Sequence, residues 1–467
     1  MKNSMIILIA GLVLLSVAPL VGGDRSNPRG MGMARTVNAT VRQFDALGIN
    51  PALLGVPTRG TVSIGLVKAG FGVGADFMSY DVYSDYFTGV VDGNGEVVPK
   101  YLTTEDKERI LSGFPDDIGT VIGDGEGGLL GTSVYIEGLG GIGFSATDHF
   151  GGKAMIPADY ARFVLYGLDS LGSRYLLDGA GVGAWWWREY NLSFGMQIPL
   201  GKGSLRQMYA GIGLKLVHGF GVAETVHSHG LLANERTGIN QYVALVELDY
   251  RVRRSGTAFL GESGGDFETF PAPAGSGFGV DLGVAANLDG VLATLSITDI
   301  GSIHWTENLF ETSSSYAGII TDPFSEATKD SIEKAIEGQT APGSAFSTSL
   351  PTRLRIGFSF LSDSVRALRG FPSGLLLAFD YTQGLTNSLN NTTTPRFSLG
   401  VEYRPIYFLP LRSGVSVGGG TGVRWAAGFG LDFHYASFDL GLENVLLLFD
   451  PSGYDMLSVG AGLTIRL

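Results

Sequence analysis

The chain has 467 residues, of which 71 are glycine, and only 16% are charged. Its 27 phenylalanines and 18 tyrosines exclude a disordered chain, and glycine does not recur at every third position, which excludes collagen. The net charge of −13 argues against a nucleic-acid partner, and the lack of cysteine excludes disulfides, thiolate metal sites and a lipidated cysteine anchor.

The N-terminus has the pattern of a secretory signal peptide. Lys2 precedes an apolar run from Met5 to Val17, which is too short to cross a bilayer as a helix. Small residues at Val21-Gly22-Gly23 predict cleavage there, so that residues 1–23 form the signal peptide and the mature chain begins at Asp24. Charged residues interrupt every later apolar stretch of helical span length. This excludes membrane-spanning helices and leaves a secreted all-β protein or an outer-membrane barrel.

A segment over residues 24–58 precedes the first predicted strand. It contains a small-residue stretch, Gly30 to Ala34, and the triplet Asn50, Pro51 and Ala52. Taken alone, an Asn-Pro pair predicts only the start of a turn.

From residue 59 to residue 467, apolar residues alternate with glycine, small or polar residues. In the segment 354–360, for example, every large apolar side chain falls on one face of a strand. This alternation gives fifteen candidate strands: 60–70, 129–137, 139–148, 184–198, 206–219, 239–252, 276–288, 291–300, 351–361, 374–383, 396–405, 411–420, 423–434, 435–444 and 456–467. Single-chain bacterial barrels have even strand numbers, so we expect about fourteen strands, with one of the fifteen candidates being a bend or part of an over-split strand.

The composition of the two strand faces separates a membrane barrel from a soluble sandwich. A sandwich has a richly charged outer face and packs its apolar face inward. In this chain one face is uniformly Leu, Val, Phe and Tyr, and the other is dominated by glycine and small residues. This pattern favours lipid as the neighbour of the apolar face. The expected fold is therefore an all-β, antiparallel transmembrane β-barrel.

Several segments between and within these strands have their own signals. Residues 104–111, 159–166 and 324–337 are expected to form short loop helices. Trp185, Trp186 and Trp187 are expected to anchor the barrel at the membrane–water interface, where a tryptophan ring is buried and its N–H meets water. The six histidines are scattered and are interpreted as loop residues; His227 and His229 are the only close pair, and we expect no metal site.

The last predicted strand alternates up to the C-terminus, with Leu463, Ile465 and Leu467 on one face. It resembles the C-terminal signal that the barrel-assembly machinery reads in outer-membrane proteins. Such signals usually end in an aromatic residue, and Leu467 stands in that place. The alternative is the terminal strand of a soluble sheet.

Two motif matches could indicate an enzyme. Residues 414–418 match G-x-S-x-G and residues 138–143 match G-x-G-x-x-G. The first requires a strand-to-helix turn and the second a phosphate-binding helix, but both lie within continuous strand alternation. We therefore expect neither an enzyme, such as an outer-membrane lipase, nor a bound cofactor.

The N-terminal segment resembles the hatch of the FadL-like family of long-chain fatty-acid transporters, in which an Asn-Pro-Ala motif matches Asn50, Pro51 and Ala52. Segments near residues 281–284, 298–305 and 395–403 resemble the related PorV-like barrels. The resemblance implies a barrel of fourteen strands with residues 24–58 as a plug in its lumen.

Two functions follow from the resemblance. The first is an outer-membrane transporter or channel for hydrophobic small molecules, gated by a hatch around Asn50, Pro51 and Ala52, with a route that could lead sideways between strands. The alternative is a PorV-like, non-conducting barrel whose loops dock secreted or surface-attached proteins. The expected partners are outer-membrane lipid, a hydrophobic ligand and the barrel-assembly machinery, with secretion-system proteins added under the alternative.

Overall fold

The structure is a computed structural model that describes most of the mature chain. The described residues are 25–58, 60–168, 172–199, 207–238, 241–256, 271–288, 290–320, 325–363, 373–386, 391–433, 435–450 and 456–467. The expected signal peptide, residues 1–23, lies outside them. No helix among the described residues is long and apolar enough to cross a membrane.

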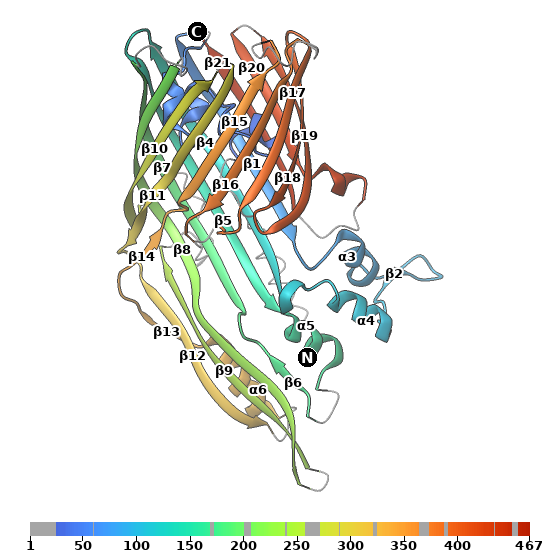
Figure 1. Ribbon diagram of the computed structural model, residues 1–467. Coiled ribbons are helices and arrows are strands. Elements are labelled where there is room, and N and C mark those ends of the chain that lie inside the picture. Colours follow the sequence, from blue (N-terminus) through green and yellow to red (C-terminus); the bar gives the residue numbers. More distant parts are fainter. Residues whose placement is uncertain are drawn as a thin grey trace.

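Fourteen antiparallel strands form a closed barrel (Figure 1), which confirms the predicted fold class. Pairing of the first strand with the last, from Ser63 opposite Arg466 to Gly74 opposite Met456, closes the cylinder. The strands, in order around the barrel, are β1 (Val62–Ala75), β4 (Ile118–Ile136), β5 (Gly140–Pro157), β7 (Gly181–Ile198), β8 (Gln207–Gly238), β10 (Gly275–Leu288), β11 (Val291–Trp305), β15 (Arg353–Leu361), β16 (Leu376–Gly384), β17 (Arg396–Ile406), β18 (Leu409–Gly418), β19 (Thr421–Phe433), β20 (Ala436–Glu443) and β21 (Met456–Arg466).

The fifteenth predicted strand is neither a bend nor part of an over-split strand. It corresponds to β9 (Gln241–Ser255), which pairs with the distal half of β8 outside the barrel. The same alternation arises in any sheet with two different faces, so periodicity alone could not separate this strand from the barrel strands.

β8 is 32 residues long and continues beyond the barrel as the centre of an extended arm (Figure 1). Strands β9, β12 (Phe310–Ile320) and β13 (Gln339–Pro342) extend the arm on one side, and β6 (Arg174–Leu176) pairs on the other. A short strand, β14 (Phe346–Ser349), pairs with β11.

The predicted helices form as α4 (Thr104–Leu111), α5 (Ala158–Tyr166) and α6 (Glu326–Glu337). A capping box between Thr103 and Asp106 begins α4. The loop between β1 and β4 also contains α3 (Tyr80–Phe87), the hairpin β2 (Val90–Val91) and β3 (Val97–Val98), and η3 (Pro115–Asp117).

The two ends of the barrel differ in the length of their connections. Near the C-terminus, residues 137–139 and 407–408 make short turns. At the opposite end, the connections after β1, β5, β8 and β11 carry α3 to α6 and the arm. We call these the short-turn end and the long-loop end.

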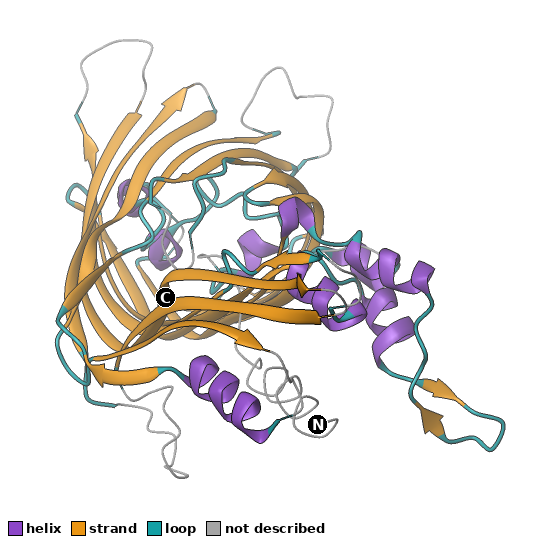
Figure 2. Cartoon of the chain, turned by 90° about the horizontal axis from the view of Figure 1, so that it is seen from below, coloured by secondary structure: helices purple, strands orange, loops and turns teal. Residues whose placement is uncertain are grey.

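Residues 25–58 form a plug inside the barrel, which Figure 2 shows as helices and loops within the ring of strands. The plug contains α2 (Pro28–Met31) and the short 3-10 helices η1 (Gln43–Ala46) and η2 (Pro51–Gly55). Nearly all of its residues are buried or half-buried, so the core of the molecule lies in the barrel lumen. The predicted luminal plug is therefore present.

Candidate functional site

The inner wall of the barrel is shaped to receive the plug by a ring of glycines. At each of them an added Cβ atom would lie within 3.0 Å of a plug atom, which real side chains do not tolerate. The plug thus packs directly on the backbone of the wall, and this accounts for part of the unusual glycine content. We call the ring the glycine girdle; it comprises Gly65, Gly70, Gly131, Gly141, Gly195, Gly211, Gly283, Gly357, Gly400, Gly414 and Gly441.

Arginines of the plug pair with carboxylates of the wall. Arg35 donates to Glu443 at 2.7 Å, Arg29 donates to Glu402 at 2.9 Å, and Arg25 pairs with Asp124. Burial lowers the pKa of Arg25, and the neighbouring Asp124 opposes that shift. These pairs lie on strands spread around the barrel, so they hold the plug on several sides.

Arg42 bonds to the backbone of the plug, whereas Arg25, Arg29 and Arg35 pair with carboxylates of the wall. Its guanidinium donates to the backbone carbonyl oxygens of Ala39 and Val41 at 3.1 and 2.6 Å. Burial, together with the nearby positive charge of Arg29, lowers its pKa to about 10. Arg42 therefore remains charged at neutral pH and is held by the turn of the plug itself.

The predicted hatch residues Asn50, Pro51 and Ala52 are buried where η2 meets the wall. The Asn50 side chain accepts a hydrogen bond from the Ala52 N–H at 3.0 Å. Its amide group donates to the carbonyl oxygens of Val284 and Leu295, on β10 and β11, at 3.3 and 3.4 Å. Asn50 therefore both begins η2 and attaches it to the barrel.

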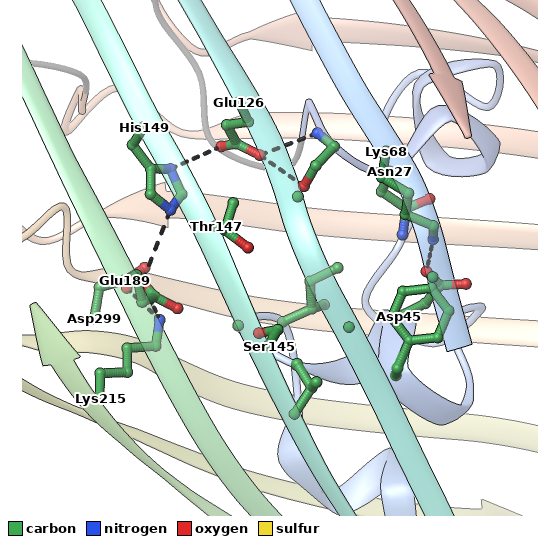
Figure 3. Close-up of a pocket in the computed structure, with 18 of the residues that line it drawn as sticks. Asn27, Asp45, Lys68, Glu126, Ser145, Thr147, His149, Glu189, Lys215 and Asp299 are labelled. Carbon is green, nitrogen blue, oxygen red and sulfur yellow. Dashed lines mark hydrogen bonds and ion pairs between the residues drawn. The ribbon is translucent and has the colours of Figure 1, made fainter. Parts of the chain in front are cut away.

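A cavity of about 100 Å³ lies between the plug and the wall (Figure 3). Phe44, Leu47 and Ile49 of the plug line it together with Leu130 of β4, while the wall strands opposite contribute charged groups. A cavity of this volume holds one small molecule or several waters.

Charged side chains from several strands meet along this cavity (Figure 3). Lys215 of β8 lies 2.5 Å from Asp299 and 3.2 Å from both Glu189 and Asp281. His149 of β5 lies between two carboxylates, 3.4 Å from Glu126 and 3.9 Å from Glu189. The cluster continues to the plug, because Glu126 accepts hydrogen bonds from the backbone and hydroxyl of Ser26 at 3.0 and 3.1 Å.

The wall beside the cavity has a break in its hydrogen-bond ladder. Strands β1 and β4 pair at Gly65–Gly131 and again at Lys68–Gly128, but the residues between these two pairs are not bonded. Irregular register also occurs at the same level between β1 and β21 and between β4 and β5. The four residues between these two pairs are apolar and exposed: Leu66, Val67, Leu129 and Leu130.

The plug covers this break from inside. The Phe44 ring packs on Gly65 and Gly131, the two girdle glycines at one margin of the break. At the other margin Lys68 pairs with Asp45, and its ammonium group lies 4.2 Å from the centre of the Phe44 ring. We call Phe44 and Asp45 the latch.

The predicted interfacial anchors lie on two faces of β7. Trp185 and Trp187 are 0% and 5% exposed and belong to a cluster inside the barrel with Trp305. Only Trp186 lies on the other face, beside Phe220. The expected anchoring role therefore does not hold for Trp185 and Trp187, because strand alternation turns them inward; for Trp186 it stays a prediction.

The assembly residues Leu463, Ile465 and Leu467 lie at the short-turn end, and Leu463 and Leu467 are exposed. Their role as a signal stays a prediction. His227 and His229 contact different carboxylates, Asp249 at 3.5 Å and Asp178 at 2.7 Å. The interpretation of the histidines as loop residues is wrong for the five that the structure describes, since His149 lies in β5, His218, His227 and His229 lie in β8, and His304 lies in β11. His149 also lines the cavity. His434 lies outside the described residues.

The latch and the charged cluster were not predicted as site residues. Their members come from strands far apart in the sequence, so no local motif marks them. The sequence marks the charged cluster only by charged residues on the strand face that is otherwise glycine and small residues, as at Glu126, Glu189 and Lys215.

The sequence matches the profile of one protein family over residues 51–440, and that family is described as a family of unknown function (DUF5723). A search of curated proteins finds no match.

Among solved structures, the chain is similar to a deletion mutant of the TodX monoaromatic hydrocarbon channel, with 12% identity, 94% of this chain and 97% of that one covered, and a TM-score of 0.48. It is also similar to a FadL homologue of Pseudomonas aeruginosa, with 12% identity, coverage of 96% and 99%, and a TM-score of 0.46. A third similar structure is the toluene transporter TbuX of Ralstonia pickettii, with 13% identity, coverage of 94% and 98%, and a TM-score of 0.42.

Proposed function

The chain belongs to the family DUF5723, whose function is unknown, and we propose that this member is an outer-membrane transporter for hydrophobic small molecules, gated by its N-terminal hatch. The proposal rests on the barrel, its plug and the wall break beside the cavity.

The outer face of the barrel supports a membrane location. Large apolar side chains point outward and are exposed around the cylinder, for example Leu192, Leu214, Phe278, Leu399 and Val459. Exposure of so many apolar residues would be costly in water, since burial of apolar area stabilises by roughly 25 cal/mol per Å². Outer-membrane barrels place short turns in the periplasm and long loops outside. We therefore assign the long-loop end to the cell exterior.

The break between β1 and β4 is the observation that carries the proposal. A hydrophobic molecule gains about 0.8 kcal/mol for each methylene that leaves water, so a route through the aqueous lumen alone would be unfavourable for it. The break lies beside the luminal cavity, and its four exposed residues are apolar. Movement of the latch, together with displacement of the hatch around Asn50, Pro51 and Ala52, would open a route through the break.

The charged lining of the cavity limits which part of a cargo enters it. Glu189, Lys215 and Asp299 present charge on β7, β8 and β11, whereas Phe44 and Leu130 present apolar surface beside the break. The Lys68–Asp45 pair adds charge at one margin of the break. The apolar part of a cargo would thus lie at the break, and a polar end would face the charged strands.

The hatch residues provide the test of gating. Asn50→Ala removes the cap of η2 and its two bonds to the wall, and we expect it to change the uptake of a radiolabelled hydrophobic solute by cells. Thr58→Ala, at the end of the plug and outside η2, is the control. Both variants should keep heat-resistant migration on gels. Loss of the folded band in Asn50→Ala, or unchanged uptake with the band intact, would contradict gating by the hatch.

A docking barrel of the PorV-like type remains the second candidate, and the arm favours it. β8, β9 and β12 extend far beyond the barrel and carry α6, a surface that a transporter does not require (Figure 1). This candidate predicts stable protein partners and loss of those partners when α5 or α6 is altered, with hydrophobic uptake unchanged.

A further inference from the structure

The loop between β1 and β4 carries a row of exposed aromatic side chains. Tyr80, Tyr83 and Phe87 of α3 are 66%, 47% and 49% exposed. Their spacing places them on one face of the helix, whereas Val82 lies on the packed side and is buried. The hairpin that follows α3 adds Val91 and Val97, which pair with each other and are both exposed.

The position of this loop indicates which surroundings the exposed aromatic side chains of α3 contact. In Figures 1 and 2, α3, α4 and the hairpin stand out sideways from the barrel at its long-loop end instead of over the lumen. The last outward residues of β1, Phe71 and Val73, are apolar and exposed, and α3 begins shortly after that strand ends at Ala75. The apolar surface of α3 therefore continues the lipid-facing band of β1.

A second loop in the same sector shows the same feature. The connection between β20 and β21 contains η5 (Val445–Leu448), and Leu446, Leu448 and Phe449 are exposed. Because β21 pairs with β1, this loop leaves the barrel beside the α3 loop. Two neighbouring connections thus present exposed apolar side chains.

We propose that α3 and the β2–β3 hairpin lie on the membrane and insert their aromatic and valine side chains into the outer leaflet next to the barrel. Aromatic side chains favour this boundary because an apolar ring and a polar tip are both satisfied there. The inference rests on the barrel spanning a membrane and does not depend on transport.

The absence of cysteine from the chain allows a direct test by single labelling. Tyr83→Cys and Asp85→Cys each receive an environment-sensitive fluorophore in the full protein, reconstituted into phosphatidylcholine vesicles that contain a lipid with a nitroxide near its headgroup. Asp85 is an exposed residue on the opposite side of the same helix and serves as the matched control. Heat-resistant migration confirms that each labelled barrel is folded.

The label at position 83 should be quenched several-fold more by the nitroxide lipid than by aqueous iodide, and the label at position 85 should show the reverse. Equal quenching of both labels by iodide, with no effect of the nitroxide, would overturn the proposal. Shielding of position 83 only after a secreted protein is added would also overturn it and would assign the surface to a protein partner.

Discussion

Glycine at the plug–wall contact is the residue on which the packing of the lumen depends. A Cβ atom at Gly441 would meet the backbone of Pro28 and Gly32, neither of which can rotate away. We expect Gly441→Ala to lower the free energy of unfolding by roughly 1 to 3 kcal/mol, the usual cost of overpacking. Urea titration of the heat-resistant band measures it.

Gly127→Ala is the matched control for this substitution, because a Cβ atom at Gly127 meets nothing within 4 Å. Equal urea midpoints for the two variants would mean that the girdle does not hold the plug.

The pair between Arg35 and Glu443 permits a second test at this scale. Both side chains are buried, and Arg424 also lies 3.9 Å from Glu443. Glu443→Gln leaves buried guanidinium charge uncompensated, which typically costs about 3 to 5 kcal/mol. The double variant Arg35→Met/Glu443→Gln should regain part of the lost stability in the same urea titration, and a double variant less stable than Glu443→Gln would contradict the pairing.

At the scale of elements, the break between β1 and β4 makes a prediction about transport. We expect a disulfide in Leu66→Cys/Leu130→Cys to hold the break closed and to abolish hydrophobic uptake until a reductant is added. Leu192→Cys/Leu214→Cys is the control, since these outward residues already face each other on β7 and β8. Uptake that is equal in the oxidised and reduced forms of the first variant would exclude a route through this break.

The strands were predictable from sequence because alternation reports directly which face of a strand each residue occupies. The same signal could not place β9, whose alternation reflects a sheet outside the barrel. Three consecutive tryptophans give no alternation, so the pattern could not show that Trp185 and Trp187 are buried inside the barrel. The cavity required pairing between strands, because Glu126 meets His149 only through the register of β4 and β5. Such register depends on turns and bulges more than on any single residue.

At the scale of the whole molecule, the plug and the arm divide the chain between two tasks. The plug packs against the glycine girdle around the lumen and leaves a small cavity beside the break. The arm extends from the long-loop end, where it contacts neither the cavity nor the break. The proposed transport would therefore depend on the plug and on β1 and β4, whereas docking would depend on the arm.

The most direct test of transport compares cells that carry the folded barrel in their outer membrane with cells that lack it. The measurement is the initial uptake rate of a radiolabelled aromatic hydrocarbon and, in parallel, of a labelled sugar. The account predicts faster hydrocarbon uptake with the barrel present and no change for the sugar, because the plug closes the lumen to polar solutes. Equal hydrocarbon uptake in both cell types would contradict it.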